Sequence, residues 1–138
     1  MATTTQIRDA VTALVAAVPG IKAMSAYPPE KVGPTPAAWL GDDVDTIAMG
    51  ALESHVHQLP LYLAVSRTAV YGNEMRAAEA LEESVMAAVR SHVTLGGLVN
   101  LLTVERRQQG RIGNGGAEYV GCVFALRAHS KWATSLSG

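Results

Sequence analysis

The chain begins with an amphipathic helical pattern. Apolar side chains recur at the three- and four-residue spacing of one helix face: Ile7, Val11, Leu14, Val15 and Val18. The threonines at positions 3–5 can cap the free amides at the start, and Pro19-Gly20 can end the helix. We therefore predict a helix over residues 4–18.

Short strands and a proline-rich loop follow this helix. Residues 21–27 and 37–40 form short apolar runs, and the prolines of residues 28–36 separate them as a loop. Asp42-Asp43-Val44-Asp45 comes next, and three acidic residues in four resist burial. We predict a solvated loop there, and the pattern of residues 46–55 assigns no element.

A longer strand is predicted over residues 56–68. Leucine and valine alternate with other residues from Leu59 to Val65, which is the period of a half-buried strand. Pro60 lies within this run. Because proline cannot donate to a ladder, it predicts an edge position or a bulge.

A second helix is predicted over residues 74–93, after a turn at 71–73 in which Asn73 is the candidate N-cap. Its expected buried stripe consists of Ala78, Leu81, Val85, Ala88 and Val89. Its expected solvated face holds mainly Glu79, Glu82, Glu83 and Arg90. Gly96-Gly97 supplies the conformational freedom with which many helices end.

The last third of the chain predicts a long hairpin. Strands over residues 98–108 and 117–129 flank a glycine-rich turn or flexible loop at 110–116. Alternation in the second strand places Tyr119, Gly121 and Val123 on one side and the following residues on the other: Val120, Cys122, Phe124 and Leu126. Residues 130–138 predict a weakly ordered tail, with Trp132 as its anchor.

Together these elements predict an α+β fold: an antiparallel-rich sheet with two main helices packed on one face and a long C-terminal β-hairpin. A length of 138 residues and a hydrophobic fraction of 49% suit one folded domain and exclude a disordered chain. We place that domain at residues 1–129 and the tail at 130–138.

Charge separates along the chain although the net charge is only −1. Residues 1–60 carry a net charge of −3 and residues 105–138 a net charge of +3. The small total excludes a strongly basic nucleic-acid module, whereas the separation can attract copies of the chain to one another or arise by chance. The start lacks a basic leader, so we expect synthesis in the cytoplasm and no membrane partner.

Few residues suggest chemistry. His55 and His57 would lie on one face of a strand, where two imidazoles can ligate a metal. Glu53 or Asp45 could add a ligand, but no cysteine or histidine spacing supplies a third and fourth. The lone Cys122 excludes an internal disulfide and suits a small buried hydrophobe. We therefore expect no metal, no cofactor and no catalytic residue.

Two charged groups are candidates for contact with another molecule. One is the acidic loop and the other the basic hairpin: Asp42, Asp43, Asp45, Arg106, Arg107 and Arg111. The alternative is that both are merely solvated surface, since charged residues seldom enter a core. The hypothesis is that they form a subunit interface or a contact with a larger assembly.

The order of these segments resembles the tail terminator proteins of long-tailed bacteriophages with non-contractile tails. The likeness covers most of the chain, and its more telling pieces are the junction at Leu95-Gly96-Gly97 and the late run Gly115-Gly116-Ala117-Glu118-Tyr119-Val120-Gly121. Earlier pieces are Tyr27-Pro28-Pro29 and the run from Gly33 to Leu40.

The resemblance implies a structural virion protein without cofactor or catalysis, assembled in the host cytoplasm. It implies a homo-oligomeric ring, a hexamer, on the head-proximal end of the tail tube. There the ring stops polymerisation of the major tail tube protein and meets the head-completion or connector protein; genome DNA could pass through without being read in sequence. The alternatives are a related head–tail connector, a small metal-dependent enzyme using His55 and His57, and an oligomeric ligand-binding domain.

Overall fold

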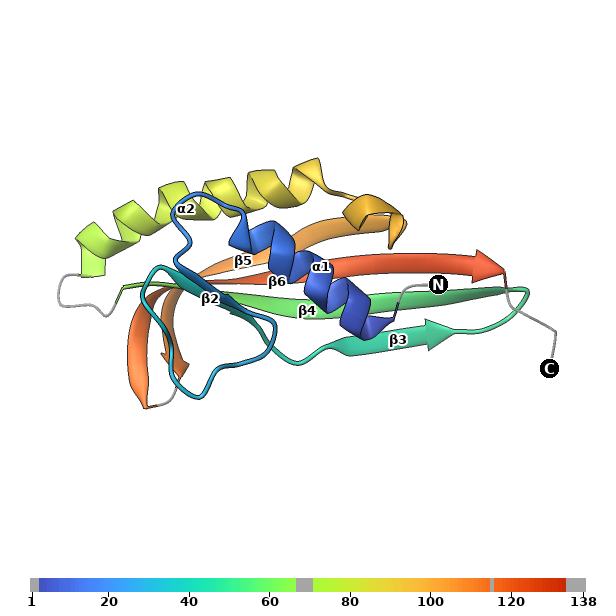
Figure 1. Ribbon diagram of the computed structural model, residues 1–138, viewed down its shortest axis with the longest axis horizontal. Coiled ribbons are helices and arrows are strands. Elements are labelled where there is room, and N and C mark those ends of the chain that lie inside the picture. The colour runs from blue at the N-terminus through green and yellow to red at the C-terminus, as the bar shows by residue number, and fades with distance from the viewer. Residues whose placement is uncertain (1–2, 67–70, 115, 134–138) are drawn as a thin grey trace.

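The computed structural model describes residues 3–66, 71–114 and 116–133 (Figure 1). In chain order its elements are α1 (Thr4–Ala16), β1 (Ala23–Ser25), β2 (Ala37–Leu40), β3 (Val44–Ala48), β4 (Leu52–Ser66), α2 (Tyr71–Ser91), a 3-10 turn (Leu95–Gly97), β5 (Leu101–Asn114) and β6 (Ala117–Ala133). In this part of the chain, no helix is both long enough and apolar enough to cross a membrane.

The strands of the described chain form one six-stranded sheet in the order β1-β2-β4-β6-β5, with β3 also paired to β4. Only β1 and β2 run parallel; the other pairings are antiparallel. Both helices lie over the same face of the sheet (Figure 1). The predicted α+β class, with its C-terminal hairpin, is confirmed.

The main core lies between the helices and the sheet. It joins the predicted apolar rows of α1, α2, β4 and β6, including Val11, Val85, Leu61 and Phe124, each at most 1% exposed. A smaller apolar cluster lies around Trp39, whose ring stacks on Tyr62 with 5.6 Å between centroids. The sheet is therefore packed on both faces over part of its length.

Helix α1 is capped as its sequence predicts. The Thr3 side chain accepts from the Gln6 amide over 3.1 Å, and the Gln6 side chain accepts from the Thr3 amide over 2.8 Å. Arg8, only 4% exposed, donates to the carbonyls of Ala26 and Gly41 over 2.6 and 2.9 Å. These bonds tie the helix to the segments that follow β1 and β2.

Pro60 occupies neither of the positions that its sequence predicts. It lies inside β4, which is bordered on one side by β6 and on the other by β2 and β3 in succession. β2 pairs with residues 61–64 and β3 with residues 54–58, so Pro60 falls between the two. The missing proline N–H is tolerated because no ladder bond is required at this gap.

Two predictions for α2 were wrong. The helix begins at Tyr71, so Asn73 lies within it and is not its N-cap. Glu82 is fully buried, whereas the sequence placed it mostly on the solvated face. The side chain of Gln109 donates to both Glu82 carboxylate oxygens, which supplies the partners that a buried carboxylate needs.

The hairpin is longer than its sequence predicts. Residues 110–114 belong to β5 rather than to a loop, because β6 offers a continuous partner as far as Ala117. At its other end β6 continues to Ala133 and pairs with β4, so the predicted boundary at residue 129 was wrong. Residues 134–138, and the side chain of Trp132, lie outside what the structure describes.

Candidate functional site

The core-facing row of β4 changes from leucine to histidine along the strand. Leu63, Leu61 and Leu59 are at most 1% exposed, and His57 continues the same row at 2%. His55 is the next residue of this row, because side chains two apart share a face. The alternation that the sequence showed for the leucines therefore extends to both histidines.

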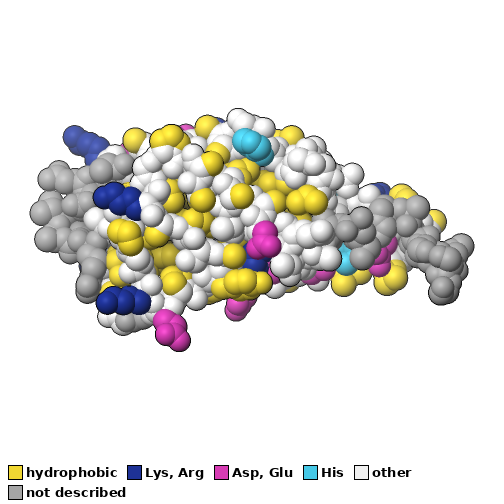
Figure 2. All heavy atoms as spheres, in the orientation of Figure 1, with side chains coloured by type: hydrophobic (Ala, Val, Ile, Leu, Met, Phe, Trp, Pro, Cys, Tyr) yellow, Lys and Arg dark blue, Asp and Glu magenta, His cyan; other side chains and the backbone are white. Residues whose placement is uncertain are grey.

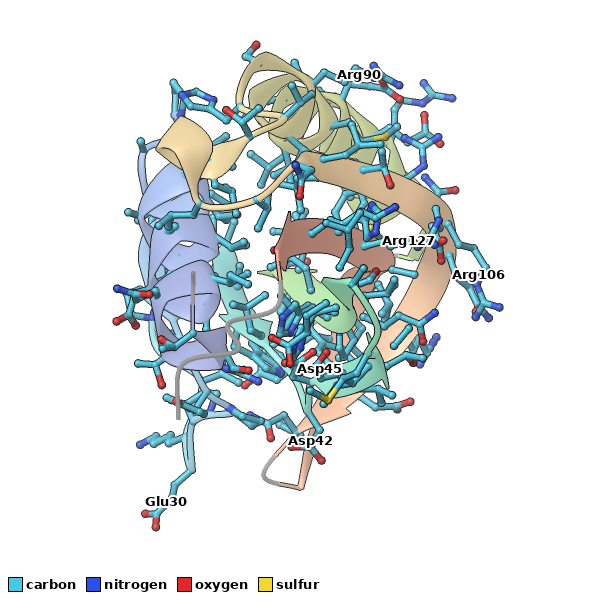
Figure 3. The ribbon with its side chains drawn as sticks, turned by 90° about the vertical axis from the view of Figure 1, so that its right-hand side faces the viewer. Glu30, Asp42, Asp45, Arg90, Arg106 and Arg127 are labelled. Atoms are coloured by element: carbon cyan, nitrogen blue, oxygen red, sulfur yellow. The ribbon has the colours of Figure 1, made fainter. Side chains whose placement is uncertain are left out.

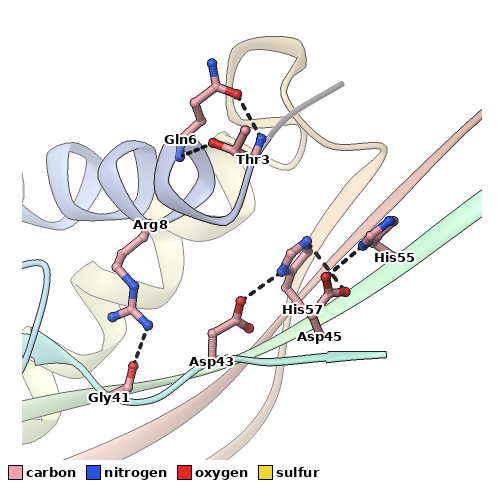
Figure 4. Close-up of polar contacts among 8 residues, drawn as sticks. All are labelled: Thr3, Gln6, Arg8, Gly41, Asp43, Asp45, His55 and His57. Carbon is pink, nitrogen blue, oxygen red and sulfur yellow. Dashed lines mark hydrogen bonds and ion pairs between the residues drawn. The ribbon is translucent and has the colours of Figure 1, made fainter. Parts of the chain in front are cut away.

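Strand β3 brings carboxylates to these imidazoles. Asp45 pairs with His57 across the strands, and Asp43 precedes β3 on the same side. His57 Nδ1 donates to Asp43 Oδ2 over 3.0 Å, and His55 Nδ1 donates to Asp45 Oδ2 over 2.7 Å (Figure 4). We call these four residues the His–Asp cluster. The imidazole rings stack with centroids 5.9 Å apart.

The predicted solvated loop at residues 42–45 was therefore wrong for two of its three acids. The side chains of Asp43 and Asp45 are only 8% and 24% exposed, and both face histidine. Their burial is tolerated because each accepts a hydrogen bond. Asp42 alone remains exposed. Asp45, one of the two acids that the sequence offered as a further ligand, is the one that the β3–β4 pairing brings to His55 and His57.

The three arginines do not gather at the hairpin tip. Arg107 faces α2 and donates to Glu83 Oε1 over 2.6 Å, with Glu82 Oε1 3.8 Å away. The hydrogen bond to Glu83 is the main cause that raises the pKa of the Arg107 guanidinium above its ordinary value. Arg107 therefore holds helix to sheet and is not a free surface cation.

Arg106 and Arg111 lie apart from Arg107. Arg106 Nη2 donates to Gln108 Oε1 over 2.8 Å, and an ion pair of 3.8 Å joins Arg111 to Glu118 across the hairpin. Arg106 and Asp42 line the same hollow of about 360 Å³, which Pro60 and Val123 also border. Figure 3 shows Arg106 at the outer edge of the molecule and Asp45 nearer its middle.

Cys122 is not placed for nucleophilic chemistry. It is fully buried beneath α2. Burial, and next to it the charge and hydrogen bond of Glu82, raise the pKa of the Cys122 thiol well above its ordinary value. A thiol that stays protonated is a poor nucleophile, as the sequence predicts for this residue.

Sequence reasoning missed several exposed apolar side chains on β3, the turn after it and the start of β4, a segment that we call the β3–β4 arm (residues 44–52). Val44 and Ile47 project from opposite faces of β3. Exposure reaches 57% for Val44, 54% for Ile47, 70% for Met49 and 48% for Leu52. Figure 2 shows apolar side chains at the surface at this end of the molecule. Residues 46–55 follow no single hydrophobic period, so their sequence pattern did not predict the arm.

No family model matches the sequence, and no curated protein matches it. The arrangement of these residues suits two kinds of interaction. The arm presents exposed apolar side chains beside a strand edge that no other described strand pairs with, which suits association. The His–Asp cluster presents nitrogen and oxygen ligands, which suit a cation.

Proposed function

We propose that this protein is a structural assembly protein of a bacteriophage, a tail terminator. In this proposal it forms a homo-oligomeric ring, a hexamer, on the end of the tail tube in the virion. The ring stops polymerisation of the tube and provides the surface for the head-completion or connector protein. The protein acts by association and not by catalysis.

The observation that carries this proposal is the β3–β4 arm. Within the described residues, β3 pairs with β4 alone, so its outer backbone edge is open to another strand. Exposed apolar side chains on both faces of an open strand edge suit contact with another molecule that pairs with this edge. Such an arm suits a subunit whose open strand edge and exposed apolar side chains are covered by a neighbouring subunit.

The two outer strands of the sheet also support a head-to-tail ring. In the run β3-β4-β6-β5, the edge strands are β3 and β5. Exposed Asp42 lies beside β3, and exposed Arg106 and Arg111 lie on β5. A ring requires two different surfaces on each subunit, and the edges of β3 and β5 are two such surfaces; Asp42 and Arg106 border a single hollow and so do not distinguish the two edges by charge.

The test combines oligomer mass with tail length. We expect the wild-type chain to form a ring, alone at micromolar concentration or on purified tail tubes, and to cap tubes at normal length. The variant Ile47→Asp/Met49→Asp should stay folded, because both side chains are exposed, yet should stay monomeric and leave over-long tails.

Val93→Asp is the matched control, since Val93 is 41% exposed but lies away from the arm, just after α2. It should assemble and cap tails as the wild-type chain does. A wild-type chain that stays monomeric with tail tubes present would contradict the proposal. Binding to heads in preference to tubes would assign the ring to a connector role instead.

A further inference from the structure

We propose that the His–Asp cluster is a binding site for a divalent transition metal, with zinc as the best fit. The ligands are Asp45, His55 and His57. Their ligand atoms lie within 4.8 Å of one another. Asp43 is not a ligand but accepts a hydrogen bond from His57 Nδ1. This inference does not depend on the proposed function.

The first argument is the orientation of His57. Its Nδ1 donates to Asp43 Oδ2, so in the neutral imidazole the lone pair lies on Nε2. That nitrogen lies 3.9 Å from Asp45 Oδ1, too far for a hydrogen bond. In that form the lone pair and the carboxylate oxygen repel each other, and either a proton on Nε2 or a metal cation between the two atoms removes the repulsion. The separation also suits a shared ion, because two ligands of a tetrahedral zinc lie about 3.3 Å apart.

The second argument is the outer carboxylate. Histidines that bind metals usually donate their other ring N–H to a carboxylate or carbonyl, which fixes the tautomer and the ring orientation. Asp43 performs this role for His57, and the two side chains are only 8% and 3% exposed. Such a buried pair is already arranged for a ligand on the opposite side of the ring.

The third argument concerns buried polar atoms at the His–Asp cluster that lack a hydrogen-bond partner among the described residues. Asp43 Oδ1, Asp45 Oδ1 and Ser130 Oγ are buried and have no hydrogen-bond partner within the described part of the chain. Ser130 lies directly across from His55 in the β4–β6 pairing. Buried oxygens without partners are costly, and a cation held by Asp45, His55 and His57 would satisfy Asp45 Oδ1.

The donor set selects the class of metal. Two imidazoles and a carboxylate suit zinc and its first-row neighbours, whereas calcium and magnesium prefer oxygen ligands. Glu53 lies beside the site, with Oε2 3.7 Å from His55 Nε2. A metal here would tie β3 to β4 and so fix the β3–β4 arm.

The experiment uses the full-length chain without a histidine tag. Zinc titration by calorimetry should give one site per chain, and zinc should raise the melting temperature while equal magnesium should not. Asp43→Asn should weaken zinc binding by about 10- to 100-fold, as loss of an outer partner does. His55→Gln and Asp45→Asn, which remove ligands, should weaken it at least as much.

The matched control is His92→Gln, since His92 is exposed beyond α2 and its ring bonds the carbonyl of Ala88, away from the His–Asp cluster. It should bind zinc as the wild-type chain does. Cobalt in place of zinc should give the visible bands of a tetrahedral site, and Asp45→Asn should abolish them. Circular dichroism in chelator confirms that each variant is folded.

Wild-type affinity no greater than that of folded His55→Gln would overturn the inference. So would equal stabilisation by magnesium, or cobalt bands that survive in Asp45→Asn. His57 is deliberately left unchanged, because its burial makes loss of folding a competing explanation.

Discussion

Gly121 on β6 lies so close to Leu63 on β4 that a Cβ at position 121 would overlap the Leu63 carbonyl oxygen. The contact is with backbone in the middle of the sheet, so no side chain can rotate away to relieve it. Only glycine allows the two strands to approach to this distance.

Gly121→Ala should therefore destabilise the protein by more than about 2 kcal/mol, as overpacking against a rigid backbone does. Gly113→Ala is the control, because its added Cβ would meet nothing closer than the Ala117 carbonyl at 3.9 Å. That change should alter the free energy of unfolding by less than about 1 kcal/mol. Urea unfolding measures the loss of stability in both variants. Equal losses would contradict the close contact between Gly121 and Leu63.

The Cys122 thiol should make stability depend on alkaline pH. Burial raises its pKa above the ordinary value of 9.0, so above that pH the unfolded thiol ionises while the folded thiol keeps its proton. Stability should then fall as pH rises, with a slope of up to about 1.4 kcal/mol per pH unit from this group. Cys122→Ala should lack that part of the slope between pH 9 and 11.

Thiol labelling provides a second check on Cys122. The native protein should resist iodoacetamide at pH 8.5, and the protein in urea should react at once. Labelling of the native chain at the rate of a free thiol would show that the residue is accessible, contrary to its burial beneath α2.

Arg107 and Arg106 should respond differently to charge reversal. Arg107→Glu would place a carboxylate beside buried Glu82 and exposed Glu83, so we expect a loss of more than about 1 kcal/mol of stability. Arg106→Glu changes an exposed side chain and should stay within about 0.5 kcal/mol. Thermal melts at low and high salt measure both; similar losses would contradict the helix contact of Arg107.

Arg8 should matter for stability although it is charged. Arg8→Met keeps the apolar stem but removes the donors to the carbonyls of Ala26 and Gly41. We expect a cost of about 1–3 kcal/mol, the usual penalty for buried acceptors left without donors. Arg90→Met, at an exposed position on α2, is the control and should change stability little.

The parts of the fold that rest on a local hydrophobic period could be predicted from the residues alone. The helical spacing from Ile7 to Val18 identified α1, and the alternation from Leu59 to Val65 and from Val120 to Leu126 identified the core rows of β4 and β6. These patterns could be interpreted because each arises where a single helix or strand buries one of its faces. The α+β class followed from their order.

The candidate sites depended on pairings that no local pattern encodes. One extra residue, Glu105, shifts the register of β5 against β6, and it turns Arg107 and Gln109 toward α2. Asp45 meets His57 only because β3 folds back along β4 in one register. A shift of one residue moves every side chain to the opposite face. Register is set by the packing of the whole sheet, so tertiary structure alone decided which charges are buried and which face solvent.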